Sequence, residues 1–494
     1  MINNDSKMPV VLIGNSFKYE IEATLKLFFN TARFRFCGDR GEIDTSQYIV
    51  AEVRESADIC SFATEVCLGG EPVVNEGNAA PDLLEHEICR SLFHTLCKMT
   101  GIRPPWGIMT GIRPVKKVIE LMEQGMDEEQ IRQNLTERFE LLPEKLSLAY
   151  RTAVDQLPIL RKIDRSAASL YVSIPFCPTR CSYCSFVSHS MDSARKLMPE
   201  YIAALCRELE LIGEIVRETG TKIDTIYFGG GTPTSISADE LRAVMEAVGH
   251  SFDLGSIREY SVEAGRPDTI TAEKLRVIKE LGASRISVNP QTLNDDVLRV
   301  IGRQHSGEDA IRAFELARSL GFDNINTDLI AGLPTESADS FRSTLDRICE
   351  LSPESITVHT LTLKRSAELF ENSSANLKNP VAEMVDYSIG KLIDCGYLPY
   401  YMYRQKNTLD NLENVGYAKK GFESWYNIFI MDETQTILGA GCAASTKLVY
   451  PDGKIKRIHN YKFPYEYINR FDELMAKKTE VTECLRKIKS IQPK

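Results

Sequence analysis

The sequence lacks the features that mark membrane proteins, secreted proteins and general nucleic-acid binders. No stretch approaches about 18 uninterrupted apolar residues, which argues against a membrane-spanning helix. No basic N-terminal segment leads into a long apolar run, so we expect no signal peptide and a cytoplasmic location. The chain also has few positive charges relative to negative ones: 59 Lys and Arg residues against 69 Asp and Glu residues give a formal net charge of −10. Without an overall positive field, the chain is not expected to bind nucleic acid or anionic lipid.

A secretory disulfide framework is a further feature that the sequence does not support. The chain has 13 cysteines, an odd number, in 494 residues of ordinary globular composition, enough for roughly two to four domains. In a reducing cytoplasm thiols stay reduced, so we interpret a tight group of cysteines as metal-binding or catalytic. The scattered cysteines are interpreted as small buried hydrophobic residues, and they are Cys37, Cys60, Cys67, Cys89, Cys97, Cys206, Cys349, Cys395, Cys442 and Cys484.

The first 165 residues are predicted to form a separate α+β domain that ends in a helical connector. Short β-type runs occur at 9–13, 33–36 and 48–53, and leucines recur at helical spacing across 82–99. A charged joint at 161–165 follows, and we place the domain boundary there. The pattern does not indicate what this domain does. Further helices are predicted at 115–124, 127–139 and 144–160.

Two similar tetrapeptides, Gly101-Ile-Arg-Pro104 and Gly111-Ile-Arg-Pro114, precede the first of these helices. The plainer interpretation is a structured connector. The alternative is that Arg103 and Arg113 hold the carboxylates of a ligand or dock this domain onto the next one.

From Leu170 onward, strand-like and helix-like segments alternate regularly. A capping box, Ser237-x-x-Glu240, marks the start of one helix. Six βα units in a row indicate a parallel sheet with helices outside, which is either an open doubly wound sheet or a complete or partial barrel. The predicted strands are 171–176, 225–228, 260–264, 284–289, 324–330 and 355–362.

Unusual polar residues at the ends of these strands favour the barrel. In a (β/α) barrel the chemistry gathers where the strands end, because all carboxyl ends open onto one rim. We therefore predict a partial (β/α)6 barrel over residues 166–405 and a short substrate-covering C-terminal extension over 406–494. The residues at the strand ends are Cys177, Gly229-Gly-Gly-Thr-Pro233, Glu263, Gln291, Asp328 and His359–Thr362.

The most specific signal is the run Cys177-Pro-Thr-Arg-Cys181-Ser-Tyr-Cys184. Three thiolates on one short loop do not complete a four-coordinate zinc site, and His189 is the nearest further candidate, at an unusual spacing. Thiolates are natural ligands of iron–sulfur clusters, and three of them on a four-iron cluster leave one iron free for a small molecule. Structural zinc stays as the lesser alternative.

This C-x3-C-x2-C spacing resembles the signature of the radical S-adenosylmethionine (radical SAM) superfamily, whose domain is a TIM-like barrel. The surrounding segments resemble the oxygen-independent coproporphyrinogen III oxidase (dehydrogenase) family over about Leu170 to Thr446. The N-terminal unit and the run 399–407 are similar to the branch usually named the Z-type coproporphyrinogen dehydrogenase. The segments that carry the resemblance are Leu170–Phe186, Phe228–Thr234, Asp328–Pro334 and Leu438–Gly441.

The resemblance implies a [4Fe-4S] cluster held by Cys177, Cys181 and Cys184. The open iron of that cluster chelates the amino and carboxylate groups of S-adenosylmethionine, and an electron cleaves the sulfonium to a 5′-deoxyadenosyl radical. The electron would come from a donor such as flavodoxin or ferredoxin.

The resemblance also implies contacts for this first S-adenosylmethionine. Tyr171 matches a tyrosine that contacts it, and the glycines around Gly230 let the backbone approach its methionine part. Glu263 matches the carboxylate that holds its ribose, with a solvated rim charge as the alternative. Ser445 falls where the family has an apolar cofactor contact. The alternative for the glycine run is a plain strand-to-helix turn.

A second S-adenosylmethionine is implied beside the first. Gln291, Arg303 and Asp328 keep the family's residue types, and with Tyr171 they are the expected catalytic residues. Arg303 would grip a carboxylate with two parallel hydrogen bonds, although a salt bridge between Arg303 and Asp328 is the competing interpretation. The residues expected at this second site are Tyr183, Gly231, Thr232, Gln291, Arg303, Asp328 and Thr362.

The implied reaction is the oxidative decarboxylation of two propionates of coproporphyrinogen III to vinyl groups, which gives protoporphyrinogen IX. Phe186 stands where the well-studied form has a further cysteine, a pattern also found in the related haem-chaperone branch. Only a short segment follows Gly441, where the family has a longer cap over the substrate. The open alternatives are a haem chaperone and another radical SAM enzyme that acts on haem.

Two further features are candidates for contact with a tetrapyrrole. His359 stands at a strand end, where a proton donor and a satisfied buried histidine are equally expected. The second feature is a basic aromatic run that fits a planar anionic ring, with ordinary packing as its alternative. Its residues are Tyr400, Tyr401, Tyr403, Arg404 and Lys406.

Overall fold

The computed structural model describes residues 7–29, 32–54, 56, 58–111, 113–184, 189–362, 367 and 380–491. The chain divides into two compact units, Met1–Tyr150 with Arg404–Glu413, and Arg151–Tyr403 with Asn414–Lys494. The domain boundaries expected after residues 165 and 405 stay predictions, because a compact unit need not fold on its own. None of the described helices is long and apolar enough to cross a membrane.

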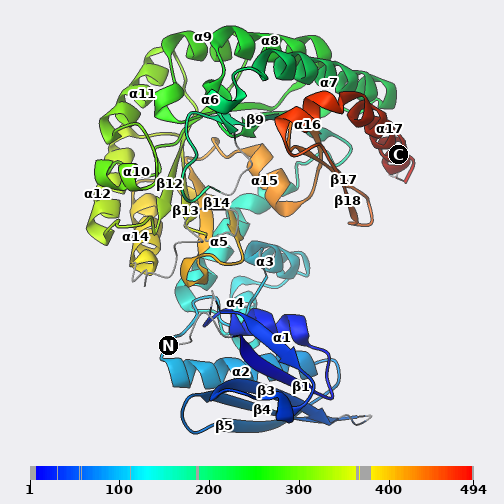
Figure 1. Ribbon diagram of the computed structural model, residues 1–494, viewed down its shortest axis with the longest axis vertical. Coiled ribbons are helices and arrows are strands. Elements are labelled where there is room, and N and C mark those ends of the chain that lie inside the picture. Colours follow the sequence, from blue (N-terminus) through cyan, green and yellow to red (C-terminus); the bar gives the residue numbers. More distant parts are fainter. Residues whose placement is uncertain are drawn as a thin grey trace. The chain divides into compact units, whose positions relative to one another are not determined.

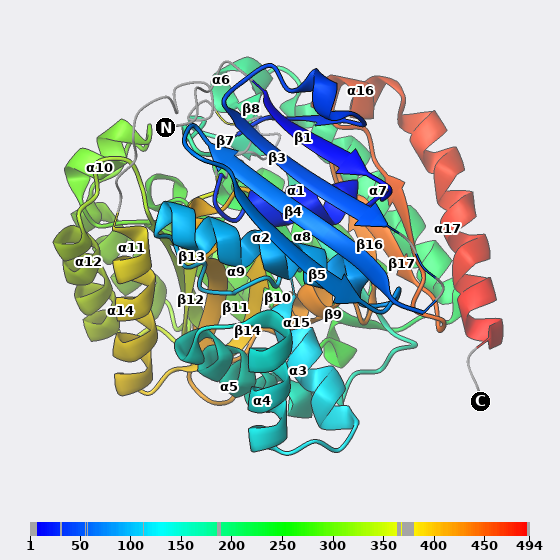
Figure 2. The ribbon, with the colours of Figure 1, turned by 90° about the horizontal axis from the view of Figure 1, so that it is seen from below.

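The N-terminal unit begins with a five-stranded sheet in the order β2-β1-β3-β4-β5. Strand β1 is parallel to β2 and β3, while β3, β4 and β5 form an antiparallel meander. Helices α1 and α2 lie on one face of this sheet (Figure 2). The elements are β1 Met8–Ile13, α1 Lys18–Leu25, β2 Phe34–Cys37, the 3-10 helix η1 Arg40–Glu42, β3 Gln47–Arg54, β4 Cys60–Leu68, β5 Val73–Ala79 and α2 Leu84–Thr100.

The expected strands at 9–13, 33–36 and 48–53 are confirmed by β1, β2 and β3, but the sequence analysis did not identify β4 and β5. Strand β5 is mostly exposed and contains Gly77, so its own composition does not favour a strand. Gly77 pairs with Phe62 on β4, and a Cβ at this position would lie 2.5 Å from the Phe62 ring. Cross-strand packing therefore selects this glycine.

Helices follow the sheet, as their periodicity predicted. They are α3 Pro114–Glu123, α4 Glu128–Phe139 and α5 Pro143–Leu160. Asp127 caps α4 in a reciprocal capping box with Gln130. Residues 404–413, with the 3-10 helix η5 Leu409–Asn411, also belong to this unit.

A buried ion pair anchors the segment 404–413 within this unit. Glu413 accepts from Trp106 Nε1 at 2.7 Å and from Lys145 Nζ at 2.8 Å.

The second unit contains the predicted succession of βα units. Strands β6, β9, β10, β11, β12 and β13 lie side by side in chain order, and each pairs in parallel with the next. Figure 1 shows the helices as an outer arc around these strands. The elements are β6 Ala168–Ile174, β7 Phe176–Cys177, β8 His189–Ser190, α6 Met191–Ala194, α7 Met198–Thr219, β9 Ile223–Gly230, η2 Pro233–Ser235, α8 Ala238–Ser251, η3 Leu254–Ser256, β10 Glu259–Gly265, η4 Pro267–Thr269, α9 Ala272–Glu280, β11 Arg285–Val288, α10 Asp295–Val300, α11 Gly307–Ser319, β12 Ile325–Ala331, α12 Ala338–Leu351, β13 Ser355–Thr360 and α14 Val381–Asp394.

The C-terminal segment extends this sheet at both edges. The full order is β14-β15-β13-β12-β11-β10-β9-β6-β16-β17-β18, and β16 is parallel to β6. Among the described residues these eleven strands form one open sheet, with β14 and β18 as its edge strands. An open sheet is expected for a partial barrel. The added elements are β14 Leu398–Arg404, β15 Glu413–Ala418, α15 Trp425–Asp432, β16 Thr436–Ala440, β17 Ser445–Val449, β18 Ile455–His459, α16 Pro464–Asn469 and α17 Phe471–Ile491.

A buried carboxylate connects the last helices to the barrel. Glu208 on α7 forms a 2.8 Å ion pair with Lys478 on α17, and both side chains are at most 2% exposed. Glu208 also accepts from Tyr467 Oη, Asn460 Nδ2 and the backbone N–H of Gly441. A buried charge is tolerated when all its bonding positions are filled in this way. The network thereby fixes the turn after β16.

Candidate functional site

The parallel strands bring the predicted polar residues to one edge of the sheet. Tyr171 on β6 is in register with Tyr227 on β9, and Asp328 on β12 precedes the strand end. Glu263 on β10 is close enough to both Asp328 and His359 for their charges to affect its pKa. Carboxylates, tyrosines and a histidine from the parallel strands therefore lie near one another.

The three cysteines lie on the loop that follows β6. Its first part, Phe176–Cys177, pairs with His189–Ser190, and Cys177 Sγ lies 3.4 Å from Thr232 Oγ1. In the second part, Cys184 N–H donates to Cys181 O. Within the described ranges, no three His, Cys, Asp or Glu side chains already form a metal-binding group. The structure thus places the three thiols on one loop.

Two further residues bear on this loop, Phe186 and His189. Phe186 lies outside the described residues. His189 is half-buried and packs its ring edge-to-face against Phe463, with 6.0 Å between centroids, while its Nε2 has no hydrogen-bond partner among the described residues.

Arg303 lies against the cysteine loop. Its guanidinium donates to Tyr183 Oη at 3.2 Å and to Asn289 O at 2.6 Å, and it also contacts Cys181. Burial acts to lower the pKa of Arg303, but the neighbouring Tyr183 and Cys181 groups raise it above the usual value. Among the described residues Arg303 forms no ion pair with Asp328, so the competing salt-bridge interpretation is wrong.

Asp328 instead lies beside His359. The carboxylate is 3.8 Å from His359 Nε2 and accepts from Asn326 Nδ2 at 2.7 Å. On its other side, His359 Nδ1 is 3.5 Å from Tyr403 Oη. Burial acts to raise the pKa of Asp328, but His359 and Asn326 hold it below its usual value. This carboxylate is therefore held in its anionic form.

Several buried polar atoms at this rim have no hydrogen-bond partner in the described part of the chain. They are Asn289 Oδ1, Gln291 Oε1 and Arg303 Nε. Gln291 also has a positive φ of 72°, which is strained for a side chain of this kind. Unsatisfied buried groups and local strain together are typical of a ligand site. The polar groups of a small molecule would satisfy them.

Glu263 lies in an aromatic wall. Tyr227 Oη donates to its carboxylate, and Tyr227 stacks on Tyr426 with 4.4 Å between ring centroids and on Tyr171 with 6.3 Å. Burial is the main cause that raises the pKa of Glu263 to about 7. A Cβ at Gly229 would lie 3.0 Å from the Tyr227 ring, so only glycine leaves this wall undisturbed.

The glycines at the end of β9 have a structural role. Gly230 has a φ of 111°, and a Cβ at Gly231 would lie 2.6 Å from Phe176 O. Gly231 N–H also donates to Ile174 O at 2.8 Å. Backbone atoms of Ile174 and Phe176 lie against Gly230 and Gly231, so these glycines hold the strand-to-helix turn tightly against the cysteine loop.

Ser445 and Thr362 are the remaining predicted cofactor contacts. Ser445 begins β17 and packs on Gly439, which is in register with Tyr171. The Ser445 hydroxyl is buried and finds no partner among the described residues. Thr362 ends the described segment after β13 and donates to Thr360 O at 3.3 Å.

The basic aromatic run is not a single surface. Tyr400 and Tyr401 are buried in a cluster with Ile428 and Phe429, which supports the packing alternative. In the N-terminal unit, the buried Arg404 guanidinium donates to Met109 O and Asn411 O. Burial lowers the pKa of Arg404 to about 10.

Two other interpretations are tested by the contacts. Arg103 pairs with Glu140 at 3.2 Å, which supports the structured connector. Cys395 is exposed, so its interpretation as a buried hydrophobic residue is wrong.

The sequence analysis missed Arg266 and Asp268. Both come directly after β10, and the Arg266 guanidinium donates to Thr179 in the cysteine loop. A signal was present, because Gly265-Arg-Pro-Asp268 stands at a strand end like the residues that were identified.

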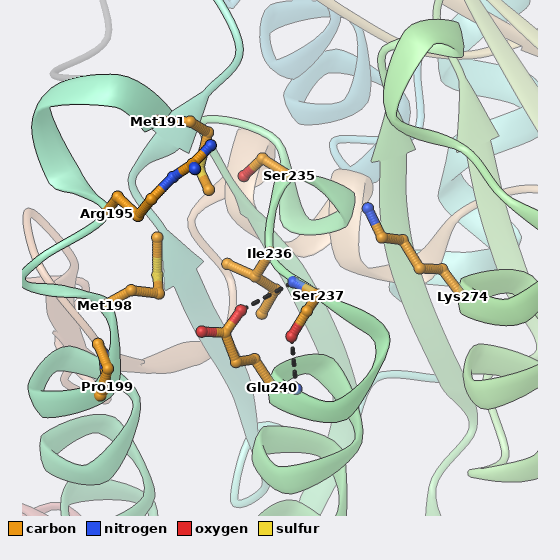
Figure 3. Close-up of a pocket in the computed structure, with 9 residues that line it drawn as sticks. All are labelled: Met191, Arg195, Met198, Pro199, Ser235, Ile236, Ser237, Glu240 and Lys274. Atoms are coloured by element: carbon orange, nitrogen blue, oxygen red, sulfur yellow. Dashed lines mark hydrogen bonds between the residues drawn. The ribbon is translucent and has the colours of Figure 1, made fainter.

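A hollow of about 360 Å3 is lined by residues that include Met191, Ser235 and Lys274 (Figure 3). Ser235 Oγ is within hydrogen-bonding distance of Phe176 O, next to Cys177, and of Thr232 O. Figure 3 also shows the predicted capping box, in which Ser237 and Glu240 bond reciprocally. None of the predicted cofactor residues lines this hollow, so it is distinct from the candidate site.

Comparisons with known proteins agree with this geometry. Residues 171–348 match the radical SAM superfamily model. The oxygen-independent coproporphyrinogen-III oxidase-like protein HemZ of Bacillus subtilis is 41% identical over 419 residues, covering 82% of this chain and 84% of that protein. The heme chaperone HemW of the same organism is 33% identical over 280 residues, covering 55% and 69%.

The solved structure of coproporphyrinogen III oxidase HemN from Escherichia coli, described as a radical SAM enzyme, superimposes with a TM-score of 0.51. Identity is 22%, with 65% of this chain and 73% of that chain covered, so this likeness supports the fold alone.

Together these matches imply a [4Fe-4S] cluster and S-adenosylmethionine as cofactors. The residues present fit both groups. Three thiols on one loop suit the cluster, and the unpartnered atoms of Gln291 and Arg303 suit a ligand with amino and carboxylate groups. On its cysteine motif, its fold and its identity to HemZ, the chain belongs to the oxygen-independent coproporphyrinogen-III oxidase-like family of the radical SAM superfamily.

Proposed function

We propose that this protein catalyses the oxygen-independent oxidative decarboxylation of coproporphyrinogen III to protoporphyrinogen IX. The observation that carries the proposal is the group of buried, unpartnered polar atoms on Asn289, Gln291 and Arg303 beside the cysteine loop. Such atoms cost free energy in a resting protein unless a ligand satisfies them. A site prepared in this way is expected of an enzyme that binds a charged cofactor.

In this proposal Cys177, Cys181 and Cys184 hold the [4Fe-4S] cluster. When bound, the cluster and S-adenosylmethionine supply the radical that removes a hydrogen atom from a substrate propionate. The protein binds and orients the reactants and excludes water. Tyr171, Gly230, Glu263 and Ser445 contact the S-adenosylmethionine at the cluster.

Glu263 has a defined task in this site. Its carboxylate would accept hydrogen bonds from the ribose hydroxyls, with Tyr227 keeping it in place. Because burial raises the pKa of Glu263 to about 7, the protonated form is substantially populated near neutral pH.

A second S-adenosylmethionine would be held by Arg303 and the residues around it. Gln291, Arg303 and Asp328 would carry its polar contacts, with Tyr183, Gly231, Thr232 and Thr362 around it. The fixed guanidinium of Arg303 and the anionic Asp328 offer opposite charges, which match the carboxylate and amino group of an amino acid.

The second candidate function is haem transfer. Heme chaperones named HemW match this chain at 28–33% identity in several bacteria. The alignment with HemZ covers 82% of the chain and that with HemW of the same organism 55%, which favours the oxidase-like assignment. Another radical SAM reaction on haem is a third outcome of the same test. The electron donor, flavodoxin or ferredoxin, stays a prediction.

Turnover under anaerobic conditions separates these functions. The cluster is reconstituted, and reductant, S-adenosylmethionine and coproporphyrinogen III are added. We expect 5′-deoxyadenosine together with a porphyrin that shows protoporphyrin fluorescence after oxidation. Cys181→Ala, which lacks a cluster ligand, is the control and should form neither. Stoichiometric haem binding with no vinyl product would instead support the chaperone, and haem consumption would support the third function.

A further inference from the structure

Arg266 connects the end of β10 to the cysteine loop. Its side chain is 3% exposed. Nη1 donates to Thr179 O at 3.0 Å and lies 2.8 Å from Thr179 Oγ1, within hydrogen-bonding distance. Thr179 stands midway between Cys177 and Cys181. A single guanidinium group therefore holds the middle of the segment that joins the first two cysteines.

Asp268 fixes the orientation of that guanidinium. Its carboxylate accepts from Arg266 Nε at 3.0 Å and from Nη2 at 2.7 Å, which is the two-pronged arrangement. Such pairs are planar and directional, so the remaining Nη1 points in a defined direction. Asp268 is itself placed by the 3-10 helix η4, which begins one residue after β10 with Arg266 as its N-cap.

The cysteine loop is also attached to the chain that follows α10. Thr179 Oγ1 donates to Gly302 O at 2.9 Å, and Ser182 N–H donates to Ile301 O at 3.1 Å. Both acceptors follow α10. Thr179 is thus held from two directions, by the strand end of β10 and by the chain after α10.

We propose that Arg266, oriented by Asp268, is a positioning residue that fixes the conformation of the Cys177–Cys184 loop for binding of the iron–sulfur cluster. The inference rests on the cluster-binding part of the proposed function and is independent of the tetrapyrrole substrate. Residues that orient metal ligands are commonly worth about 10–100-fold in metal affinity. Lysine does not replace arginine here, because it cannot bond to Asp268 and Thr179 in the same plane.

The first test needs no cluster. Amide hydrogen exchange is measured on the apoprotein, and the amides of Ser182 and Cys184 report on the loop. In Arg266→Met we expect these amides to exchange about tenfold faster, because charge-assisted hydrogen bonds are lost. Arg266→Lys should fall between wild type and Arg266→Met. Exchange at the wild-type rate in Arg266→Met would overturn the proposal.

The matched control is Arg258→Met. Arg258 also pairs with an aspartate, since its Nε donates to Asp224 Oδ1 at 3.0 Å, but this pair lies at the opposite end of the strands. We expect this variant to leave loop exchange unchanged. A loop that loosens equally in Arg258→Met and Arg266→Met would show a general loss of stability and contradict the positioning role.

The second test uses the reconstituted protein. Iron and sulfide per chain, the electron paramagnetic resonance signal of the reduced cluster and the rate of iron loss to a chelator are measured. Arg266→Met should lose iron about 10–100-fold faster than wild type, while Arg258→Met should not. Wild-type rates of iron loss in Arg266→Met would refute the proposal.

Thr179→Val should fold even if the Arg266 variants do not, because Thr179 is only half-buried. It removes the hydroxyl contacts to Arg266 and Gly302 and keeps the carbonyl bond. We expect a smaller change in the same direction in both tests. If the wild-type protein binds no four-iron cluster, the proposed function fails, while the apoprotein exchange still decides the role of Arg266.

Discussion

At the scale of single residues, the site combines strain with missing hydrogen bonds. Gln291 has a positive φ and a buried amide oxygen with no partner among the described residues. Its backbone joins the sheet, because Gln291 N–H donates to Asp328 O and Gln291 O accepts from Ile330 N–H. The surrounding sheet therefore imposes the conformation, and the free side chain is available for a ligand.

Strain and function at Gln291 can be separated by comparing two substitutions. Gln291→Gly relieves the positive φ, whereas Gln291→Ala keeps the strain, so the glycine variant should be more stable by about 1 kcal/mol. Both variants lose the amide and should bind S-adenosylmethionine more weakly than wild type. Thermal unfolding and a binding titration on the reconstituted protein measure the two effects. Equal binding by wild type and both variants would contradict a ligand role for this side chain.

Glu336 gives a prediction about pH. This carboxylate is 2% exposed, and burial raises its pKa to about 7 although Thr292 donates a hydrogen bond to it. The folded state thus favours the protonated form. The stabilisation from protonation is complete below the unfolded pKa of about 4.5 and is lost as pH rises through about 7.

Glu336→Gln removes this titration and keeps an acceptor for Thr292. Compared with the variant, the wild-type protein should lose about 1–3 kcal/mol of unfolding free energy between pH 5 and pH 8. Urea unfolding of both proteins at several pH values measures the difference. Parallel curves for the two proteins would contradict the raised pKa.

At the scale of elements, the sequence predicted the parallel strands and most helices of the second unit. Each of these segments buries its own apolar face, so local periodicity carries the information. Strand β5 was missed because it is exposed and is selected by its pairing with β4, whereas β4 alternates buried and less buried residues and could have been identified from its own sequence. Tyr400 and Tyr401 looked like a ligand surface, but α15 covers them, and that long-range contact leaves no local pattern.

The same limit applies to the candidate site. The three cysteines and the strand-end residues could be identified, because a short motif and a resemblance mark them. Arg266 acts on Thr179, which is 87 positions away in the chain. The strand-end position of Arg266 is visible in the sequence, but its relation to Thr179 becomes visible only in the structure.

The helix α17 gives a prediction about stability. Lys478→Met leaves Glu208 buried without its cation, and an unpaired buried charge costs about 3–5 kcal/mol. We expect a corresponding loss in the free energy of unfolding, measured by urea denaturation followed by circular dichroism. Lys454→Met is the control, because Lys454 pairs with Asp452 on the surface and should change little. Equal stability of the two variants would contradict a structural role for the network.

At the scale of the whole molecule, the chain joins a radical SAM unit to an N-terminal unit whose role is open. The segment 404–413 belongs to the N-terminal unit through Trp106, Lys145 and Glu413, although it connects two strands of the other unit. The N-terminal unit is thus fixed to a segment from the later part of the chain. The alignment with HemZ, which covers 82% of the chain, must include part of this unit as well.

The most direct test of the central claim follows a hydrogen atom. Coproporphyrinogen III carrying deuterium on its propionate β-carbons is incubated anaerobically with the reconstituted protein, reductant and S-adenosylmethionine. The proposed reaction predicts 5′-deoxyadenosine that contains deuterium, formed together with vinyl product and detected by mass spectrometry. Formation of 5′-deoxyadenosine without deuterium, or no vinyl product from a protein with a full cluster, would contradict the claim that this protein is a coproporphyrinogen III-decarboxylating radical SAM enzyme.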